Sequence, residues 1–180
     1  MGMGSSETPQ LRAVLFDRDG TLVVDVPYNG EPALVRPMPD AKAVLDSVRR
    51  KGLSTGVVSN QSGLGRGLLV QAQVDQVNAR VEQLLGPFDV WEICPHMDGD
   101  GCGCRKPAPG MVYSACRKLG LETSEVALIG DIGADVEAAE AAGAVGVLVP
   151  TPLTRPEEVS RARLVAPDLA GAVRLLLELA

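Results

Sequence analysis

Aromatic side chains are scarce in this chain of 180 residues, at 3% of the total. A surface that stacks nucleotide bases needs aromatic and basic side chains, whereas this chain carries a net charge of −6. It also has no apolar run near the ~20 residues that a membrane-spanning helix requires. These absences argue against binding to nucleic acid or to a membrane, but they permit a small anionic ligand held by a few local cations.

The first ten residues, MGMGSSETPQ, contain neither the basic segment nor the apolar core of a signal peptide. We therefore expect residues 1–10 to be a disordered tail and residues 11–180 to form one domain, located in the cytoplasm. Because thiols stay reduced there, the cysteines favour metal binding over disulfides. We expect a monomer or a weak homo-oligomer.

Short apolar runs alternate with helical patterns along the chain. Runs rich in Val, Leu and Ile predict strands buried on both faces of a sheet, over 11–16, 53–59, 90–94, 126–130 and 145–149. Apolar residues at helical spacing predict helices over 39–51, 70–85, 109–119, 134–142 and 168–179. This order predicts an α/β fold with a doubly wound, mainly parallel sheet, in which ligands bind beyond the carboxyl ends of the strands.

Two acidic residues follow the first predicted strand directly, in the sequence DRDGT. Asp17 and Asp19 would repel each other, so an ionised pair needs a cation or a shared proton. Mg²⁺ is the natural hard cation for oxygen ligands. The alternative is a solvated turn whose acids only cap a helix.

Four segments, in order, resemble the haloacid dehalogenase (HAD) superfamily of phosphatases. They are Asp17-x-Asp19-x-Thr21, then Ser59-Asn60-Gln61, then Lys106 in Arg-Lys-Pro, and finally Asp131 and Asp135 in GDIGAD. Each segment is a weak signal alone, but the four stand in register on the predicted elements over about residues 11–150. The resemblance implies a HAD-like Rossmannoid fold.

The resemblance also implies hydrolysis of a phosphate monoester through an aspartyl-phosphate intermediate. Asp17 would be the nucleophile, and Asp19 would protonate the leaving oxygen and later deprotonate the attacking water. Because the nucleophile and the phosphate are both anions, positive charge and hydrogen bonds are needed, from Lys106 and the Ser59 hydroxyl.

The same resemblance implies a catalytic Mg²⁺ ion. Asp17, the backbone of Asp19 and the carboxylate of Asp131 would hold it. Asp135 would support this site from the outer shell of the metal or by orienting the loops, and Thr21 would support it from the first motif.

A second group of metal ligands lies between the second and third of these motifs. Three of the four cysteines and the only histidine fall within eleven residues. Cys94, His96, Cys102 and Cys104 make a Cys₃His set, which is typical of a closed, structural zinc site. Cys116 lies in a helical pattern and is most simply a buried thiol.

A zinc knuckle joined to Arg-Lys-Pro resembles one branch of the superfamily. This branch contains the D-glycero-D-manno-heptose-1,7-bisphosphate 7-phosphatases and the histidinol-phosphate phosphatases. The segment SNQSGLGRG at 59–67 looks like the TNQSGIxRG segment of the heptose enzymes. The implied substrate is a sugar bisphosphate, whose second phosphate would require further cations, and Arg66 and Arg105 lie on suitable loops.

Two departures keep histidinol phosphate, or another small phosphorylated metabolite, as an alternative substrate. Only five residues separate His96 from Cys102, and some heptose enzymes have a longer loop there. Ile132 follows Asp131, where some heptose enzymes have a lysine.

Neither gap between the motifs is long enough for a large cap domain. The segment 24–35 is rich in turn residues and predicts a small flap that contributes Asp25 and Tyr28 to substrate binding. The loop after the second strand would add three further contacts, from Asn60, Gln61 and Ser62. The knuckle and the flap would then frame the substrate.

A non-enzymatic function is the remaining alternative, either as a receiver-like phosphate acceptor or as a zinc-knuckle binding module. A receiver needs one acceptor aspartate and has no use for an acid at Asp19. A nucleic-acid module needs a basic, aromatic surface, which this acidic chain does not have.

Overall fold

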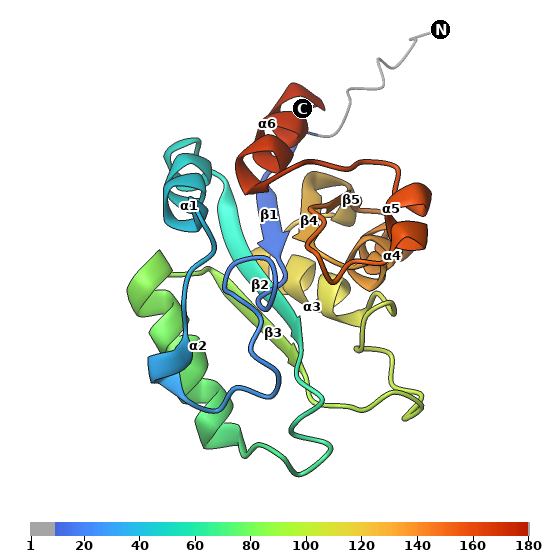
Figure 1. Ribbon diagram of the computed structural model, residues 1–180. Coiled ribbons are helices and arrows are strands. Elements are labelled where there is room, and N and C mark those ends of the chain that lie inside the picture. The colour runs from blue at the N-terminus through green and yellow to red at the C-terminus, as the bar shows by residue number, and fades with distance from the viewer. Residues whose placement is uncertain (1–9, 180) are drawn as a thin grey trace, which may run out of the picture.

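Five parallel strands form one sheet in the order β3-β2-β1-β4-β5 (Figure 1). The computed structural model describes residues 10–179, so the predicted tail lies outside the described residues except for Gln10. The strands are β1 Ala13–Phe16, β2 Ser54–Asn60, β3 Val90–Cys94, β4 Val126–Gly130 and β5 Val145–Leu148. Each neighbouring pair is parallel, which confirms the predicted doubly wound α/β sheet.

Helices connect the strands and cover both faces of the sheet (Figure 1). They are α1 Ala41–Arg50, α2 Gln71–Leu85, α3 Gly110–Leu119, α4 Gly133–Ala142, α5 Pro156–Arg161 and α6 Leu169–Leu179. Two 3₁₀ turns, η1 Pro32–Leu34 and η2 Thr123–Glu125, lie in the connections. The sequence pattern predicts each of these helices except α5, which has six residues and buries none of them, so it leaves no apolar signature.

Strand β1 shows how the core is divided. Val14 and Phe16 belong to the apolar cluster under α1, α2 and α6. Ala13 and Leu15 point to the other face, into the cluster under α3 and α4. All four side chains are buried, as the continuous apolar run predicts for the central strand of a parallel sheet.

The carboxyl ends of the strands carry loops without a cap domain. The chain between β1 and α1 contains only the turn η1, and the chain between β2 and α2 contains no helix among the described residues. The site at this edge is therefore covered only by loops, as the short gaps between the motifs predict. In the described part of the chain, none of the helices has both the length and the apolar character needed to cross a membrane.

Candidate functional site

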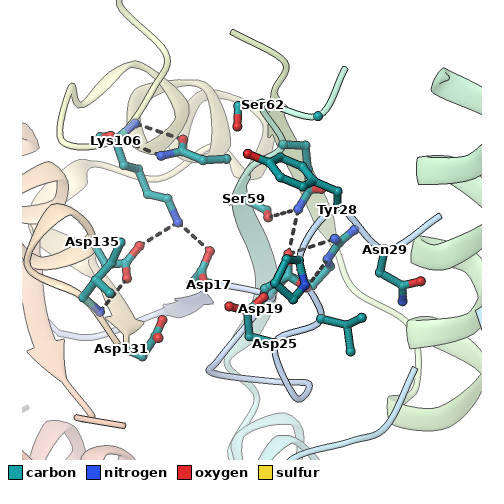
Figure 2. A pocket seen from close by; sticks show the side chains of 17 residues that line it. Asp17, Asp19, Asp25, Tyr28, Asn29, Ser59, Ser62, Lys106, Asp131 and Asp135 are labelled. Carbon is teal, nitrogen blue, oxygen red and sulfur yellow. Dashed lines mark hydrogen bonds and ion pairs between the residues drawn. The ribbon is translucent and has the colours of Figure 1, made fainter. Parts of the chain in front are cut away.

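A cavity of about 310 Å³ opens beyond the carboxyl ends of β1, β2 and β4 (Figure 2). The loop after β1 and the loop after β2 supply most of its wall, and α4 closes one side. Its lining consists of Asp17, Arg18, Asp19, Asp25, Val26, Pro27, Tyr28, Asn29, Ser59, Asn60, Gln61, Ser62, Gly63, Lys106, Asp131, Ile132 and Asp135. The four motifs that lie far apart in the sequence thus meet in one cavity.

Lys106 lies at the floor of this cavity and is only 3% exposed. Its ammonium group is 2.6 Å from a carboxylate oxygen of Asp17 and 2.6 Å from one of Asp135, and it donates a hydrogen bond to the carbonyl of Val58 at 2.6 Å. Burial alone would lower the lysine pKa, but Asp135 and Asp17 outweigh burial and raise it. The lysine is therefore a fixed positive charge beside Asp17.

The two carboxylates that contact this ammonium group form a cluster with a third, that of Asp131. Each of Asp17, Asp131 and Asp135 offers an oxygen, and these oxygens lie within 4.8 Å of one another. Burial, opposed by Lys106, raises the pKa of Asp17 well above its usual value, and the neighbouring carboxylates raise it further. Burial and Asp135 raise the pKa of Asp131 to about 7. A divalent cation fits here, because it would relieve the repulsion in a cluster of oxygen ligands.

Two glycines allow the backbone to approach these carboxylates. A side chain at Gly20, which has a φ of +85°, would collide with the carboxylate of Asp131. A side chain at Gly130 would collide with the carboxylate of Asp135. The glycine in DRDGT and the one before Asp131 are therefore steric requirements of the site.

The Asp19 side chain belongs to a different set of contacts. Its carboxylate accepts two hydrogen bonds from the Arg18 guanidinium, at 3.1 and 2.8 Å, and one from the Gln61 amide at 2.8 Å. The same amide donates to the hydroxyl of Ser59 at 2.9 Å. Sequence reasoning missed Arg18, although a basic residue between two acidic ones after an apolar strand was a usable signal.

The remaining predicted cavity residues differ in how free their side chains are. The Asn60 amide group is engaged by the backbone of Lys106, with which it makes two hydrogen bonds of 3.1 Å. Ser62 and Tyr28 face the cavity from two loops, those after β2 and β1, that meet at its rim (Figure 2). Burial raises the pKa of Asp25, and the nearby Asp19 adds to this effect.

The two predicted arginines do not line this cavity. Arg66 is exposed on the loop after β2. The Arg105 guanidinium pairs with Asp98 at 2.7 Å and donates to the carbonyl of His96 at 3.3 Å. Thr21 lies beneath the site, where its hydroxyl is 3.4 Å from an Asp131 oxygen.

The predicted knuckle residues come together after β3. Cys94 Sγ lies 3.8 Å from Cys102 Sγ and 2.9 Å from Cys104 Sγ, while His96 Nδ1 lies 3.5 and 3.2 Å from the sulfurs of Cys94 and Cys104. All the cysteines are free thiols. Two of these four separations match the ~3.5–3.8 Å expected between ligands of a tetrahedral zinc ion, and the other two are shorter. The cluster therefore fits a single metal ion.

Comparison with known proteins identifies the family. The model of the HAD-hydrolase-like family matches residues 103–172. A D-glycero-β-D-manno-heptose-1,7-bisphosphate 7-phosphatase from Pseudomonas aeruginosa is 31% identical over 92% of this chain and 97% of its own length. The chain belongs to the HAD-like phosphatases. This membership confirms the family that the four motifs predicted.

Two further comparisons support this membership. The Mesorhizobium japonicum enzyme of the same name is 36% identical over 75% of this chain and 67% of its own length. The crystal structure of the D,D-heptose 1,7-bisphosphate phosphatase from B. bronchiseptica, complexed with magnesium and phosphate, has a TM-score of 0.82 and 27% identity. It covers 94% of this HAD-like chain and 100% of its own.

Proposed function

We propose that this protein is a Mg²⁺-dependent phosphatase that removes the 7-phosphate of D-glycero-D-manno-heptose 1,7-bisphosphate. The observation that carries the chemistry is the placement of Asp17 against a buried ammonium group, inside a cluster of carboxylates. A single domain, residues 11–180, would carry the whole reaction. The named relatives support the choice of substrate.

The reaction would proceed in two displacements. In the first, an Asp17 oxygen attacks phosphorus, the bond between phosphorus and the ester oxygen breaks, and the leaving oxygen takes a proton from Asp19. In the second, a water molecule attacks the phosphorus of the aspartyl-phosphate and gives its proton to Asp19, which releases phosphate and restores Asp17. Lys106 and the Ser59 hydroxyl would stabilise the phosphoryl oxygens throughout.

The carboxylates of Asp17 and Asp131, with the backbone of Asp19, would hold Mg²⁺. When bound, the ion supplies positive charge at the phosphoryl group and helps to align the attacking and leaving oxygens. Asp135 would support this site, because it already bonds both Lys106 and the backbone N–H of Ile132, at 2.6 and 3.2 Å.

We further propose that Cys94, His96, Cys102 and Cys104 bind one structural Zn²⁺ ion. Four protein ligands leave no open position for a substrate or a water molecule, so this ion would do no chemistry. Only one residue separates Cys104 from Lys106. The ion would therefore fix the loop that carries the lysine.

The second phosphate of the substrate would lie at the rim of the cavity. Arg105 and Arg66 are the cations that we assign to it, although neither lines the cavity floor. Arg105 would then exchange its exposed partner Asp98, whose side chain is 80% exposed, for the phosphate. Tyr28 and Asp25 would contact the sugar between the two phosphates.

A direct comparison of substrates tests this assignment. We expect kcat/KM for the heptose bisphosphate to exceed that for histidinol phosphate by at least about a hundredfold. The second phosphate of the bisphosphate would bind Arg105 and Arg66, whereas histidinol phosphate has no second phosphate. Arg105→Ala should lower kcat/KM for the bisphosphate by about tenfold or more and hardly affect the monophosphate. A preference for histidinol phosphate would establish the alternative function, with the same chemistry.

Substitution of the buried lysine tests the proposed electrostatics. Lys106→Met should lower kcat/KM by about a hundredfold or more, because a fixed positive charge at the transferred group is lost. Lys118→Met is the matched control, since Lys118 is a surface lysine that pairs with Glu92 at 2.7 Å. Steady-state assays of phosphate release would measure both, and equal activity of the two variants would contradict the role of Lys106.

A further inference from the structure

Arg18 is among the largest fully buried side chains of this protein, at 1% exposure. Its Nε and one terminal nitrogen donate to separate oxygens of Asp19, at 3.1 and 2.8 Å. Its other terminal nitrogen donates to the Asn78 side chain on α2 at 2.7 Å. The guanidinium is thus fixed by a helix far along the chain while it holds the carboxylate next to it.

This arrangement constrains the Asp19 carboxylate more than a single hydrogen bond would. Two parallel N–H···O bonds fix the plane of the carboxylate as well as its position. The Gln61 amide, which bonds the same carboxylate at 2.8 Å, links it to the loop after β2. Asp19 therefore has little freedom to rotate towards the cluster of Asp17, Asp131 and Asp135.

A purely structural reason for Arg18 is weak on physical grounds. Burying an ion pair costs so much desolvation that apolar residues of similar volume often serve a fold equally well. The pair also lies at the wall of the cavity rather than in either apolar cluster. Precise orientation of the Asp19 carboxylate is a better explanation for the buried Arg18 side chain.

We propose that Arg18 is a positioning residue that orients the Asp19 carboxylate for proton transfer in both displacements. This inference rests on the proposed function, in which Asp19 first gives a proton to the leaving oxygen and then takes one from water. Without the two hydrogen bonds from Arg18, the Asp19 carboxylate would rotate. Its distances to the leaving oxygen and to the attacking water would then vary. Phosphoryl transfer to Asp17 would itself remain possible.

The test uses Arg18→Lys, which keeps the charge but cannot make the two parallel bonds. Two substrates separate proton transfer from the rest: p-nitrophenyl phosphate, whose leaving group needs no acid, and whichever alkyl ester, heptose bisphosphate or histidinol phosphate, the wild-type protein hydrolyses faster. We expect kcat/KM to fall about a hundredfold for the alkyl ester and less than about threefold for the aryl ester.

A second readout follows from the second displacement. Because hydrolysis of the aspartyl-phosphate also needs Asp19, Arg18→Lys should show a burst of p-nitrophenol and accumulate acid-stable phosphate label on the protein. Asn78→Ala removes only the anchor on α2 and should shift both readouts in the same direction by a smaller factor. This variant keeps the proposal testable if Arg18→Lys does not fold.

Arg49→Lys is the matched control. Arg49 also makes several hydrogen bonds, to the carbonyls of Leu85 and Pro87 at 2.8 Å, but it lies at the opposite end of the strands. It should change neither the ratio of the two substrates nor the burst. Equal losses on both substrates in Arg18→Lys, or no loss on either, would overturn the proposal. Wild-type protein without any phosphatase activity would instead overturn the proposed function itself.

Discussion

Asp17→Asn should abolish hydrolysis of the heptose bisphosphate, with kcat/KM reduced by at least about a thousandfold. The amide that replaces the carboxylate has no anionic oxygen with which to attack phosphorus. Asp17 follows β1 directly and lies 2.6 Å from the Lys106 ammonium group. No other carboxylate among the described residues occupies this position. Release of inorganic phosphate, followed over long incubations, would measure the loss.

The same variant should remain folded. Burial raises the pKa of Asp17, so its ionised form is disfavoured in the folded protein. A carboxyl group with a raised pKa contributes least to stability at pH values above its pKa in the unfolded chain, and neutral pH is such a value. Its replacement by an amide therefore costs little folding free energy at pH 7. Lys106 keeps Asp135 as a partner. We therefore expect an unchanged or higher unfolding temperature in metal-free buffer at pH 7.

Asp46→Asn serves as the control for Asp17→Asn. Asp46 is a surface residue of α1 that pairs with Lys42 at 2.9 Å, so the same change of carboxylate to amide occurs far from the cavity. This control should retain full activity. Robust turnover by Asp17→Asn would refute the aspartyl-phosphate mechanism, whichever substrate is hydrolysed.

Loss of a knuckle ligand should have the largest effect on stability. Cys104→Ser should lower the free energy of unfolding by about 3 kcal/mol or more, because binding energy of a structural metal is also folding energy. For a chain of this size, that corresponds to a fall of about 6–12 °C in the unfolding temperature. Calorimetry of both proteins, purified with their metals, would measure it.

Activity should fall together with this stability. The backbone of the knuckle leads through Arg105 into Lys106, and the Arg105 N–H already contacts the Cys102 sulfur at 3.4 Å. Without the metal, the segment before the lysine loses its fixed conformation. We expect a loss of activity that added Mg²⁺ does not reverse.

Cys116→Ala is the control for the knuckle. Cys116 is 3% exposed and packs in the cluster under α3 and α4, but it is not one of the four residues whose ligand atoms come together in the knuckle. Its loss should cost about 1 kcal/mol and leave the metal content unchanged. Elemental analysis should find about one zinc ion per chain in the wild type and in this control. Wild-type protein without zinc would disprove the knuckle.

The sequence was most informative where backbone geometry alone decides the outcome. Short apolar runs such as 126–130 predicted buried strands, and the parallel order then places every strand-end motif at one edge of the sheet. For this reason the positions of Asp17, Ser59 and Asp131 could be anticipated without any structure.

Contacts between distant side chains were not predictable in this way. The hydrogen bond from Arg18 to Asn78 joins residues far apart in the chain, and so do the hydrogen bonds between Asn60 and the Lys106 backbone. No periodicity encodes such pairs. The orientations of Arg66 and Arg105 were equally unpredictable. Arg66 is exposed, and the ion pair of Arg105 with Asp98 depends on the local geometry of the loop.

The two hydrogen bonds between the Asn60 side chain and the Lys106 backbone have a consequence for how this enzyme can be altered. Asn60 ends β2, so the lysine is held by the sheet itself and does not rely on the loop before it alone. The tip of that loop, around Gly99, points into open space. Longer or differently charged tips could therefore be grafted there while the Asn60 side chain keeps the Lys106 backbone in place.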